Sequence, residues 1–482
     1  SKIVEDVSVA ASLRNSRQDK TVSGLMVDAS STETFKTFYI TGGGAKDAAV
    51  TATGNVNYFG GKTETKVQSS NLNAGSGALM VGASDAANVD TVIATASGAL
   101  GAAIGVVTNI ITTDHSTGVV VTGTSTDKSS LTGTSVSVDA DAKEGISSLL
   151  IAASGAQYAA ISASVNVNRQ LSDVSAAVDQ TEVLGSFAQN ANYLGRITTS
   201  AITAAGSQYA AVPISVVINY ADNAVSSSVA HSILRAEGQS ASVGANRISE
   251  FSSLNVTASG AMYGAVAGLV NVNTIEGATS AEVNDSEVKA GQFSVNAENE
   301  DHLKVTDVTA TGAIGSLGAS VVVSYFKGSS AANLRNSIVT ADKLTVSSLQ
   351  DHYVNGTVAF ASGGIGTIGA NVFSLVIGSG DNPFASNRQD LGSAEDTVNK
   401  YLSDYASSGT GSLGFITEND ELTQEEKDKI VGSAAAADAS VSSGSGNGTS
   451  VVVSGNYLTV GSSDVSVKED SKAGSIDVTL GS

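Results

Sequence analysis

Residues 254–273 read LNVTASGAMYGAVAGLVNVN, and this stretch carries the features that decide the fold. Before Gly260, Leu254 to Ala258 alternate between apolar and polar side chains, which is the period of a β-strand. After Gly260 come small residues and then a Val/Ile-rich run that ends at Asn273. We therefore expect strands on both sides of this glycine.

The same arrangement recurs along the chain. Short runs of small residues end at glycines that are 51 to 57 positions apart, namely Gly44, Gly98, Gly155, Gly206, Gly260, Gly312 and Gly363. An asparagine lies thirteen residues after four of these glycines, at Asn57, Asn168, Asn219 and Asn273. A second pattern, Ala-x-Val-x-x-Ser-x-Val-x-Ala, follows in residues 281–290 and again, with Leu334 in place of the first valine, in 332–341. The chain thus begins inside one repeat and holds about seven more.

A unit of about 52 residues with several short strands cannot bury its apolar face alone, whereas stacked units can. The sequence therefore predicts an all-β fold, a right-handed parallel β-helix or β-solenoid, with about two coils in each repeat. A propeller blade is the main alternative at this period. It would need tight antiparallel hairpins, and Asn-Gly or Asp-Gly turns between alternating runs are nearly absent.

The repeat register is lost after residue 379 and returns near 439. Within 380–438, Val398, Tyr401, Leu402 and Tyr405 follow helical spacing, and residues 423–426 form a capping box. We expect solenoid repeats over 1–379, a small helical insertion over 380–438 and a solenoid continuation over 439–482. Insertions often carry specific function, so the insertion is a candidate contact region, with a spacer as the alternative.

Composition limits the functions that the chain can have. It contains 51 glycines, two prolines and no cysteine, and its net charge is −21. Such an acidic surface repels phosphates, so nucleic acid is not an expected partner. No apolar run reaches 18 residues, and the N-terminal residues do not resemble a signal peptide. We expect no membrane-spanning segment, and we read the sequence as a segment of a longer protein.

No catalytic or metal motif emerges from the sequence. The four histidines have no metal-ligand spacing, and we expect them to face solvent: His115, His231, His302 and His352. Residues 364–369 fit G-x-G-x-x-G but fall on a small-residue strand instead of opening a helix. No metal, no cofactor and no enzymatic activity are expected. A polysaccharide-processing β-helix enzyme is the catalytic alternative, and it would need clustered acidic and basic side chains on one face.

Two recurring residues offer candidate sites. Tyr158, Tyr209 and Tyr263 each lie three residues after a repeat glycine, so stacked coils would place them in a ladder. An exposed aromatic row can bind sugars or receptor surfaces, and packing within the turn is the alternative. With Tyr401 and Tyr405 of the insertion, these tyrosines are the candidate ligand contacts. The recurring asparagines are expected to form a buried ladder that satisfies backbone groups of turns.

The repeat resembles those of large bacterial exoproteins. The run Gly-Ala-x-Tyr-x-Ala-x-x-x-x-Val-x-Val-Asn, best seen in 155–168 and 260–273, and the Ala-x-Val-x-x-Ser-x-Val-x-Ala pattern after it look like filamentous-haemagglutinin-like adhesins and the fusobacterial leukotoxin type. The resemblance covers about 44–378 and resumes after 439. It implies type V export through a secretion barrel, by a two-partner or autotransporter route, and attachment to host cells or other surfaces.

These observations lead to one expected function and two alternatives. The expected function is the structural and adhesive stalk of a secreted or surface-displayed bacterial exoprotein. Its expected partners are a receptor or glycan on a host or bacterial surface. A segment of a secreted leukotoxin-type toxin is the second hypothesis, and the polysaccharide-processing enzyme is the third.

Overall fold

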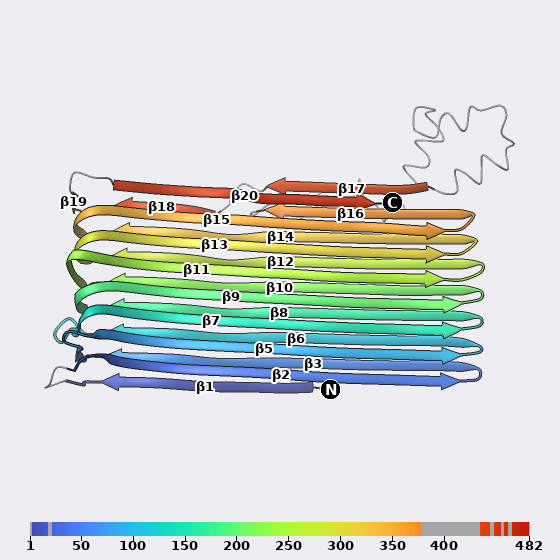
Figure 1. Ribbon diagram of the computed structural model, residues 1–482, viewed down its shortest axis with the longest axis horizontal. Coiled ribbons are helices and arrows are strands. Elements are labelled where there is room, and N and C mark those ends of the chain that lie inside the picture. The colour runs from blue at the N-terminus through green and yellow to red at the C-terminus, as the bar shows by residue number, and fades with distance from the viewer. Residues whose placement is uncertain are drawn as a thin grey trace, which may run out of the picture.

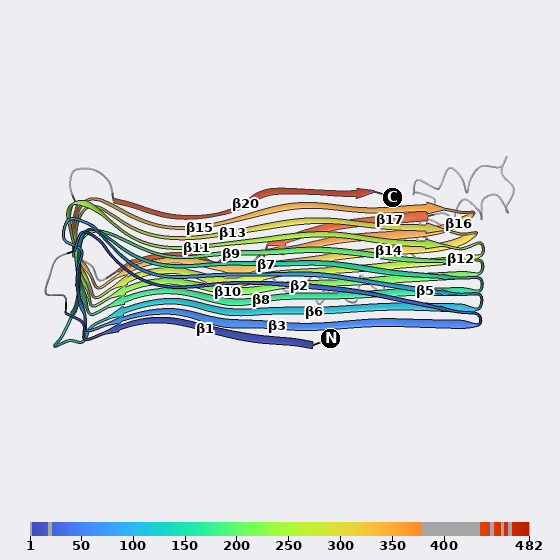
Figure 2. The same ribbon diagram turned by 60° about the horizontal axis from the view of Figure 1, so that its bottom comes forward.

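The protein is built from parallel strands in two sheets that lie face to face (Figures 1 and 2). The computed structural model describes residues 2–17 and 22–377, and beyond them the strand segments 434–443, 448–454, 457–460 and 465–481. One sheet, sheet A, contains β1 Lys2–Arg14, β3 Ala48–Gln68, β6 Ala102–Thr122, β8 Ala159–Asp179, β10 Ala210–Ala230, β12 Gly264–Asn284, β14 Gly315–Arg335, β16 Gly366–Ile377, β17 Ala434–Ser443 and β18 Gly448–Ser454. The other, sheet B, contains β2 Leu25–Ala45, β4 Asn71–Asn73, β5 Ala78–Ala99, β7 Ser129–Ala156, β9 Thr181–Ser207, β11 Ile233–Gly260, β13 Glu287–Gly312, β15 Ile338–Gly363, β19 Tyr457–Val460 and β20 Val465–Gly481.

The chain passes alternately through the two sheets. Between β5 and β16, each strand of sheet B is followed by one of sheet A, and each strand pairs in parallel with the strand one passage later. Paired residues are 51 to 57 positions apart, as in Ala159 with Ala210 and Ala210 with Gly264. One passage through both sheets thus takes the whole interval between repeat glycines. The expected all-β class with parallel strands is confirmed, whereas the expected two coils per repeat are wrong, because each coil uses two long strands instead of several short ones.

The turns at the two edges of the sheets differ. The turn from sheet B to sheet A takes two or three residues immediately after the repeat-glycine segment, such as Gln157 and Tyr158 between β7 and β8. At the opposite edge the chain turns through a residue in the left-handed region and then a buried hydroxyl residue. The left-handed residues are Asn15, Ser69, Gln180, His231, Asp285 and Asn336, with φ between 46° and 51°.

The serine of the Ala-x-Val-x-x-Ser pattern stabilises this second turn. Ser286 Oγ donates to the carbonyl of Asn284 at 2.8 Å and accepts the backbone N–H of Ser232 of the preceding coil at 3.2 Å. Ser337 repeats both contacts one coil later, donating to Arg335 O and accepting from Ser286 N. The pattern therefore marks a chain of hydroxyls that joins successive turns.

Between the sheets, apolar and polar layers alternate. One apolar block includes Val81 and Ala83 of β5, and a second includes Val89 of the same strand. Asp85 lies between them in sequence and is itself 3% exposed, so a band of polar residues separates the two blocks. Because strand side chains alternate between faces, residues at every second position of a strand share this interior.

The expected asparagine ladder is present, with a different set of partners. Asn168 Nδ2 donates to Asn219 Oδ1 at 3.0 Å, and Asn219 Nδ2 donates to Asn273 Oδ1 at 2.9 Å, with all three fully buried. Thr199 Oγ1 also donates to Asn219 Oδ1, at 2.8 Å. The amides bond one another in the middle of sheet A instead of satisfying turns. A carboxamide can donate and accept at once, so identical amides stacked one coil apart complete each other.

The expected helical insertion, 380–438, lies largely outside the described residues, which stop at 377 and resume at 434. From 434, β17 pairs in parallel with β16, and β20 pairs with β15. Strand segments therefore lie on both sheets again from residue 434, whereas the expected bounds of the continuation, 439–482, stay a prediction. Gly366 and Gly369 of the G-x-G-x-x-G run lie on β16, as predicted, whereas Gly364 lies in the turn before this strand.

Replacement of Asn219 by alanine tests the amide ladder. Asn168 and Thr199 would lose their acceptor and Asn273 would lose its donor, and each buried unsatisfied group costs about 1–3 kcal/mol. We expect Asn219→Ala to lower the free energy of unfolding in urea by about 4 kcal/mol. Asn355→Ala on the exposed outer face of β15 is the control and should change it by less than about 0.5 kcal/mol. Equal effects of the two substitutions would contradict a stabilising ladder.

Candidate functional site

Three tyrosines stack at the edge where sheet B turns into sheet A. The ring centroids of Tyr158 and Tyr209 are 5.4 Å apart with planes 14° from parallel, and those of Tyr209 and Tyr263 are 5.3 Å apart at 19°. The three residues are 55%, 44% and 52% exposed. The predicted tyrosine ladder is confirmed, and it is an exposed feature. Tyr401 and Tyr405 lie outside the described residues.

Backbone pairing fixes the spacing of the ladder. The carbonyl of Tyr158 accepts the N–H of Ala210 at 3.1 Å, and the carbonyl of Tyr209 accepts the N–H of Gly264 at 3.0 Å. Each tyrosine is therefore tied to the first strand residue of the next coil. Side chains at equivalent positions must lie about one strand spacing apart, roughly 4.8 Å, which is close to the stacking distance of aromatic rings.

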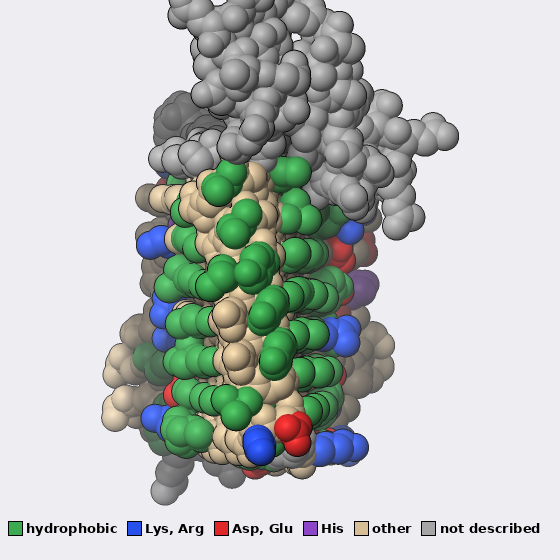
Figure 3. Space-filling view, turned by 90° about the vertical axis from the view of Figure 1, so that its right-hand side faces the viewer, with side chains coloured by type: hydrophobic (Ala, Val, Ile, Leu, Met, Phe, Trp, Pro, Cys, Tyr) green, Lys and Arg blue, Asp and Glu red, His purple; other side chains and the backbone are tan. Residues whose placement is uncertain are grey.

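The ladder is the central part of a longer apolar surface. Hydrophobic side chains cover this edge from near its foot upward, with few charges among them (Figure 3). We call it the apolar edge and define it by the exposed turn residues Leu100, Tyr158, Tyr209, Met262, Tyr263, Ile314 and Ile365. Exposed aliphatic residues near the beginnings of sheet A strands flank it, including Ile161, Val266 and Leu317. Lys46 and Asp47 occupy the equivalent turn of the first coil.

The stacking decides what the tyrosines can contact. Tyr209 has a ring on each side, so neither of its faces is free, and Tyr158 and Tyr263 each have one face covered. Sugars usually pack on an aromatic face, whereas this row offers ring edges and phenolic hydroxyls. The arrangement therefore suits an apolar protein surface with hydrogen-bonding groups better than it suits a glycan.

A shallow groove of about 630 Å³ runs beside the tyrosines on sheet B. It is lined by the small residues before and at the repeat glycines, so Ala204, Gly206, Ala258 and Gly260 are among its walls. A Cβ placed at Gly206 or Gly260 would meet no atom within 4 Å. These glycines are thus not required by close packing inside the protein, and side chains there would project into the groove.

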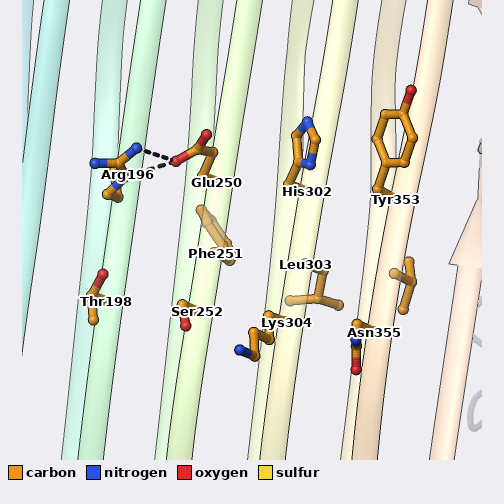
Figure 4. A pocket seen from close by; sticks show the side chains of 11 residues that line it. Arg196, Thr198, Glu250, Phe251, Ser252, His302, Leu303, Lys304, Tyr353 and Asn355 are labelled. Atoms are coloured by element: carbon orange, nitrogen blue, oxygen red, sulfur yellow. Dashed lines mark hydrogen bonds and ion pairs between the residues drawn. The ribbon is translucent and has the colours of Figure 1, made fainter. Parts of the chain in front are cut away.

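A second depression, of about 410 Å³, lies on the outer face of sheet B (Figure 4). Arg196 there holds Glu250, with Nε 2.7 Å from Oε2, and His302 stacks on Tyr353 with ring centroids 4.6 Å apart. His302 Nε2 also lies 2.7 Å from Glu300 Oε1. Glycosidic hydrolysis generally needs two carboxylates that flank the scissile bond. The depression does gather acidic and basic side chains on one face, as the polysaccharide-processing alternative would need, but Glu250 is the one carboxylate among its lining residues.

The expectation that all four histidines face solvent is wrong for two of them. His115 is 3% exposed and His352 is fully buried, because each falls on the inward-facing set of its strand. Carboxylates accompany both: His115 Nδ1 lies 3.0 Å from Asp85 Oδ2, and His352 Nδ1 lies 3.1 Å from Asp301 Oδ2. Histidine count and spacing give no sign of this, since Asp85 meets His115 across the two sheets, 30 residues away, and Asp301 meets His352 from another coil, 51 residues away.

A buried arginine, which the sequence reasoning missed, extends the polar band. Arg247 is fully buried, its Nε donates to Asn299 Oδ1 at 2.9 Å, and its Nη2 lies 3.0 Å from Asp301 Oδ1. Its Nη1 donates to the carbonyl of Glu276. Gly328 provides the space, because a Cβ there would lie 2.6 Å from Arg247 Nη2. Each nitrogen of the guanidinium thus has an acceptor, and these contacts offset the desolvation cost of burying its charge.

Asp307 is a buried carboxyl without a basic partner. Its Oδ1 accepts from Asn255 Nδ2 at 2.7 Å and from Asn271 Nδ2 at 3.2 Å, and the residue is fully buried. Burial raises the pKa of Asp307 to about 7, although the two amides partly offset that effect.

No known protein family matches the chain, and neither curated proteins nor solved structures show significant similarity to it. Among the residues that the structure describes, no helix is long and apolar enough to cross a membrane. The function is therefore argued from the fold and the apolar edge.

Asp307 gives the fold a pH dependence of known sign. The folded state holds the proton up to about pH 7, whereas the unfolded chain releases it near 3.8, so this residue lowers stability as pH rises between these values. Each pH unit is worth about 1.4 kcal/mol. We expect Asp307→Asn to change the free energy of unfolding in urea, relative to the unsubstituted chain, more favourably at pH 8 than at pH 5. The two changes should differ by about 3 kcal/mol. The exposed control Asp173→Asn should show no such difference, and a pH-independent effect of Asp307→Asn would refute the assignment.

Proposed function

We propose that this chain is part of the right-handed β-solenoid stalk of a large exported bacterial protein, and that it attaches to protein surfaces through its apolar edge. The observation that carries the proposal is the row of exposed apolar side chains held at every coil from Leu100 to Ile365. The resemblance of the repeats to bacterial adhesins agrees with it. Display at the cell surface or in the medium is part of the same proposal.

The winding supports the role of a stalk. Successive coils pair along strands of about 21 to 28 residues, and neighbouring coils are further joined by amide and hydroxyl side chains. A stack of this kind adds length without changing its cross-section, because each coil contacts chiefly its neighbours. Such a rod would hold a binding surface away from the cell.

The apolar edge supports the adhesive part of the proposal. Soluble proteins rarely expose large contiguous apolar patches, and those that do usually use them for binding. The net charge of −21 keeps the rest of the surface soluble, while the tyrosine turns themselves carry no charged residue. Tyrosine is also among the residues that contribute most to binding energy at interfaces.

A binding measurement on the whole chain tests the proposal. We expect it to bind cultured epithelial cells, and protease treatment of those cells should remove the binding while glycosidase treatment should not. The triple variant Tyr158→Ser, Tyr209→Ser, Tyr263→Ser should weaken binding at least tenfold, since it removes the aromatic row. The double variant Gly206→Glu, Gly260→Glu should do the same, because the new carboxylates enter the groove without a clash.

Two controls make this test specific. The triple Tyr→Phe variant keeps the rings and should retain most of the binding, and Tyr325→Ser on the outer face of sheet A should leave it unchanged. Full binding by both the serine triple and the glutamate double variant would exclude the apolar edge. Protease-resistant binding, or retention on a glycan array, would exclude a protein partner.

A further inference from the structure

The interior of the first coils contains a cluster of ionisable groups from several strands. Glu33 of β2, Asp85 of β5 and His115 of β6 each offer a ligand atom within 4.8 Å of the other two. His115 and Asp85 are 3% exposed, and Glu33, on the first strand of sheet B, is half-buried. Glu144 of β7, also 3% exposed, interacts electrostatically with His115.

The cluster is short of positive charge and of hydrogen-bond partners. Three carboxyls face a single imidazole, and the groups that interact electrostatically with His115 are all acidic. Asp85 receives a hydrogen bond from Thr63 at 3.3 Å, and Glu144 receives one from Thr113 at 3.1 Å. Three buried polar atoms of the cluster have no hydrogen-bond partner among the described residues: Glu33 Oε2, His115 Nε2 and Glu144 Oε1. Such groups are costly to bury unless a proton or a cation compensates them.

Small residues flank the cluster. Gly61 is paired with His115 in the neighbouring strand of sheet A, and a Cβ there would come within 3.3 Å of His115 Nδ1. Ala87 separates Glu33 from Glu144 in the equivalent column of sheet B. The long acidic side chains and the imidazole can therefore converge where neighbouring positions carry almost no side chain.

We propose that Glu33, Asp85 and His115 bind a first-row divalent cation, of the Mn²⁺ or Zn²⁺ class, within the first coils, with Glu144 supplying further negative charge. Two ligands at about 2.1 Å from a metal and at right angles to each other are about 3 Å apart, and His115 Nδ1 and Asp85 Oδ2 are separated by 3.0 Å. In the absence of metal the same pair is an ion pair.

The donor set selects the class of ion. Calcium and magnesium prefer oxygen ligands only, whereas an imidazole together with carboxylates suits Mn²⁺, Zn²⁺ and related ions. Binding requires the neutral imidazole, so the cation competes with a proton. Burial lowers the pKa of His115, but the hydrogen bond that its ring donates to Asp85 and the surrounding carboxylates raise it above its usual range overall. Affinity should therefore fall as the pH falls.

Titration of the whole, chelator-treated chain with MnCl₂ or ZnCl₂ tests the proposal. We expect one equivalent of Mn²⁺ to lose its free-ion paramagnetic resonance signal at pH 7.5, and affinity to be at least tenfold lower at pH 5.5. One equivalent of Zn²⁺ should displace it, and a tenfold excess of Mg²⁺ should not. Either metal should raise the midpoint of thermal unfolding, because it binds only the folded coils.

Single substitutions distinguish a specific metal site from non-specific attraction of cations to the acidic protein. His115→Gln should lower Mn²⁺ affinity at least tenfold, and Glu33→Gln, which changes a half-buried residue of a terminal strand, should do so without loss of the β-sheet circular dichroism. His231→Gln is the matched control, because exposed His231 also lies near two carboxylates, 2.9 Å from Asp179 and 3.8 Å from Asp285. No stoichiometric binding of either ion at 1 mM would overturn the proposal. Protonation of the carboxyls would then be what compensates their burial. Unchanged affinity in Glu33→Gln, or loss in His231→Gln, would also overturn it.

Discussion

The in-register parallel pairing of successive coils is the constraint on which the rest of the structure depends. From β5 to β16, paired residues lie 51 to 57 positions apart, so a side chain there has counterparts about one strand spacing away in the neighbouring coils. Under this constraint, residue types that can bond or stack with an identical residue in the next coil form continuous rows. Amides do so in the Asn168, Asn219 and Asn273 ladder, and aromatic rings do so in the tyrosine row.

Charge behaves in the opposite way, because identical charges stacked at strand spacing repel one another. The interior therefore mixes its ionisable residues from coil to coil. Arg247 follows uncharged Tyr193 in its column and meets Asp301 one coil later, and glycine at 328 opens the space that the guanidinium needs. Around His115 the mixture leaves an excess of carboxyls, and this imbalance motivates the proposed cation.

The same constraint produces the surface that we propose for attachment. A turn of two or three residues cannot bury a large side chain, so a leucine, tyrosine or isoleucine there projects outward in each coil from Leu100 to Ile365. Stacking covers both ring faces of Tyr209 and one face of each of its neighbours, so the row offers chiefly edges and hydroxyls, which moves the expected ligand from a glycan toward a protein surface. The amide ladder and the apolar edge thus share one origin and differ in where they lie, the ladder inside sheet A and the edge at the turns between the sheets.

The sequence alone determined the all-β class, the interval between repeats and the tyrosine row, since each of these is local or recurs at a similar spacing. It also predicted buried asparagines, although not that they bond one another. Only the tertiary structure decided that one coil uses the whole interval, that His115 and His352 are buried, and that Arg247 meets Asp301. Those facts depend on which face of a long strand points inward and on what the next coil places opposite. Charged partners there differ from one coil to the next, so their pairing leaves no periodic signal in the sequence.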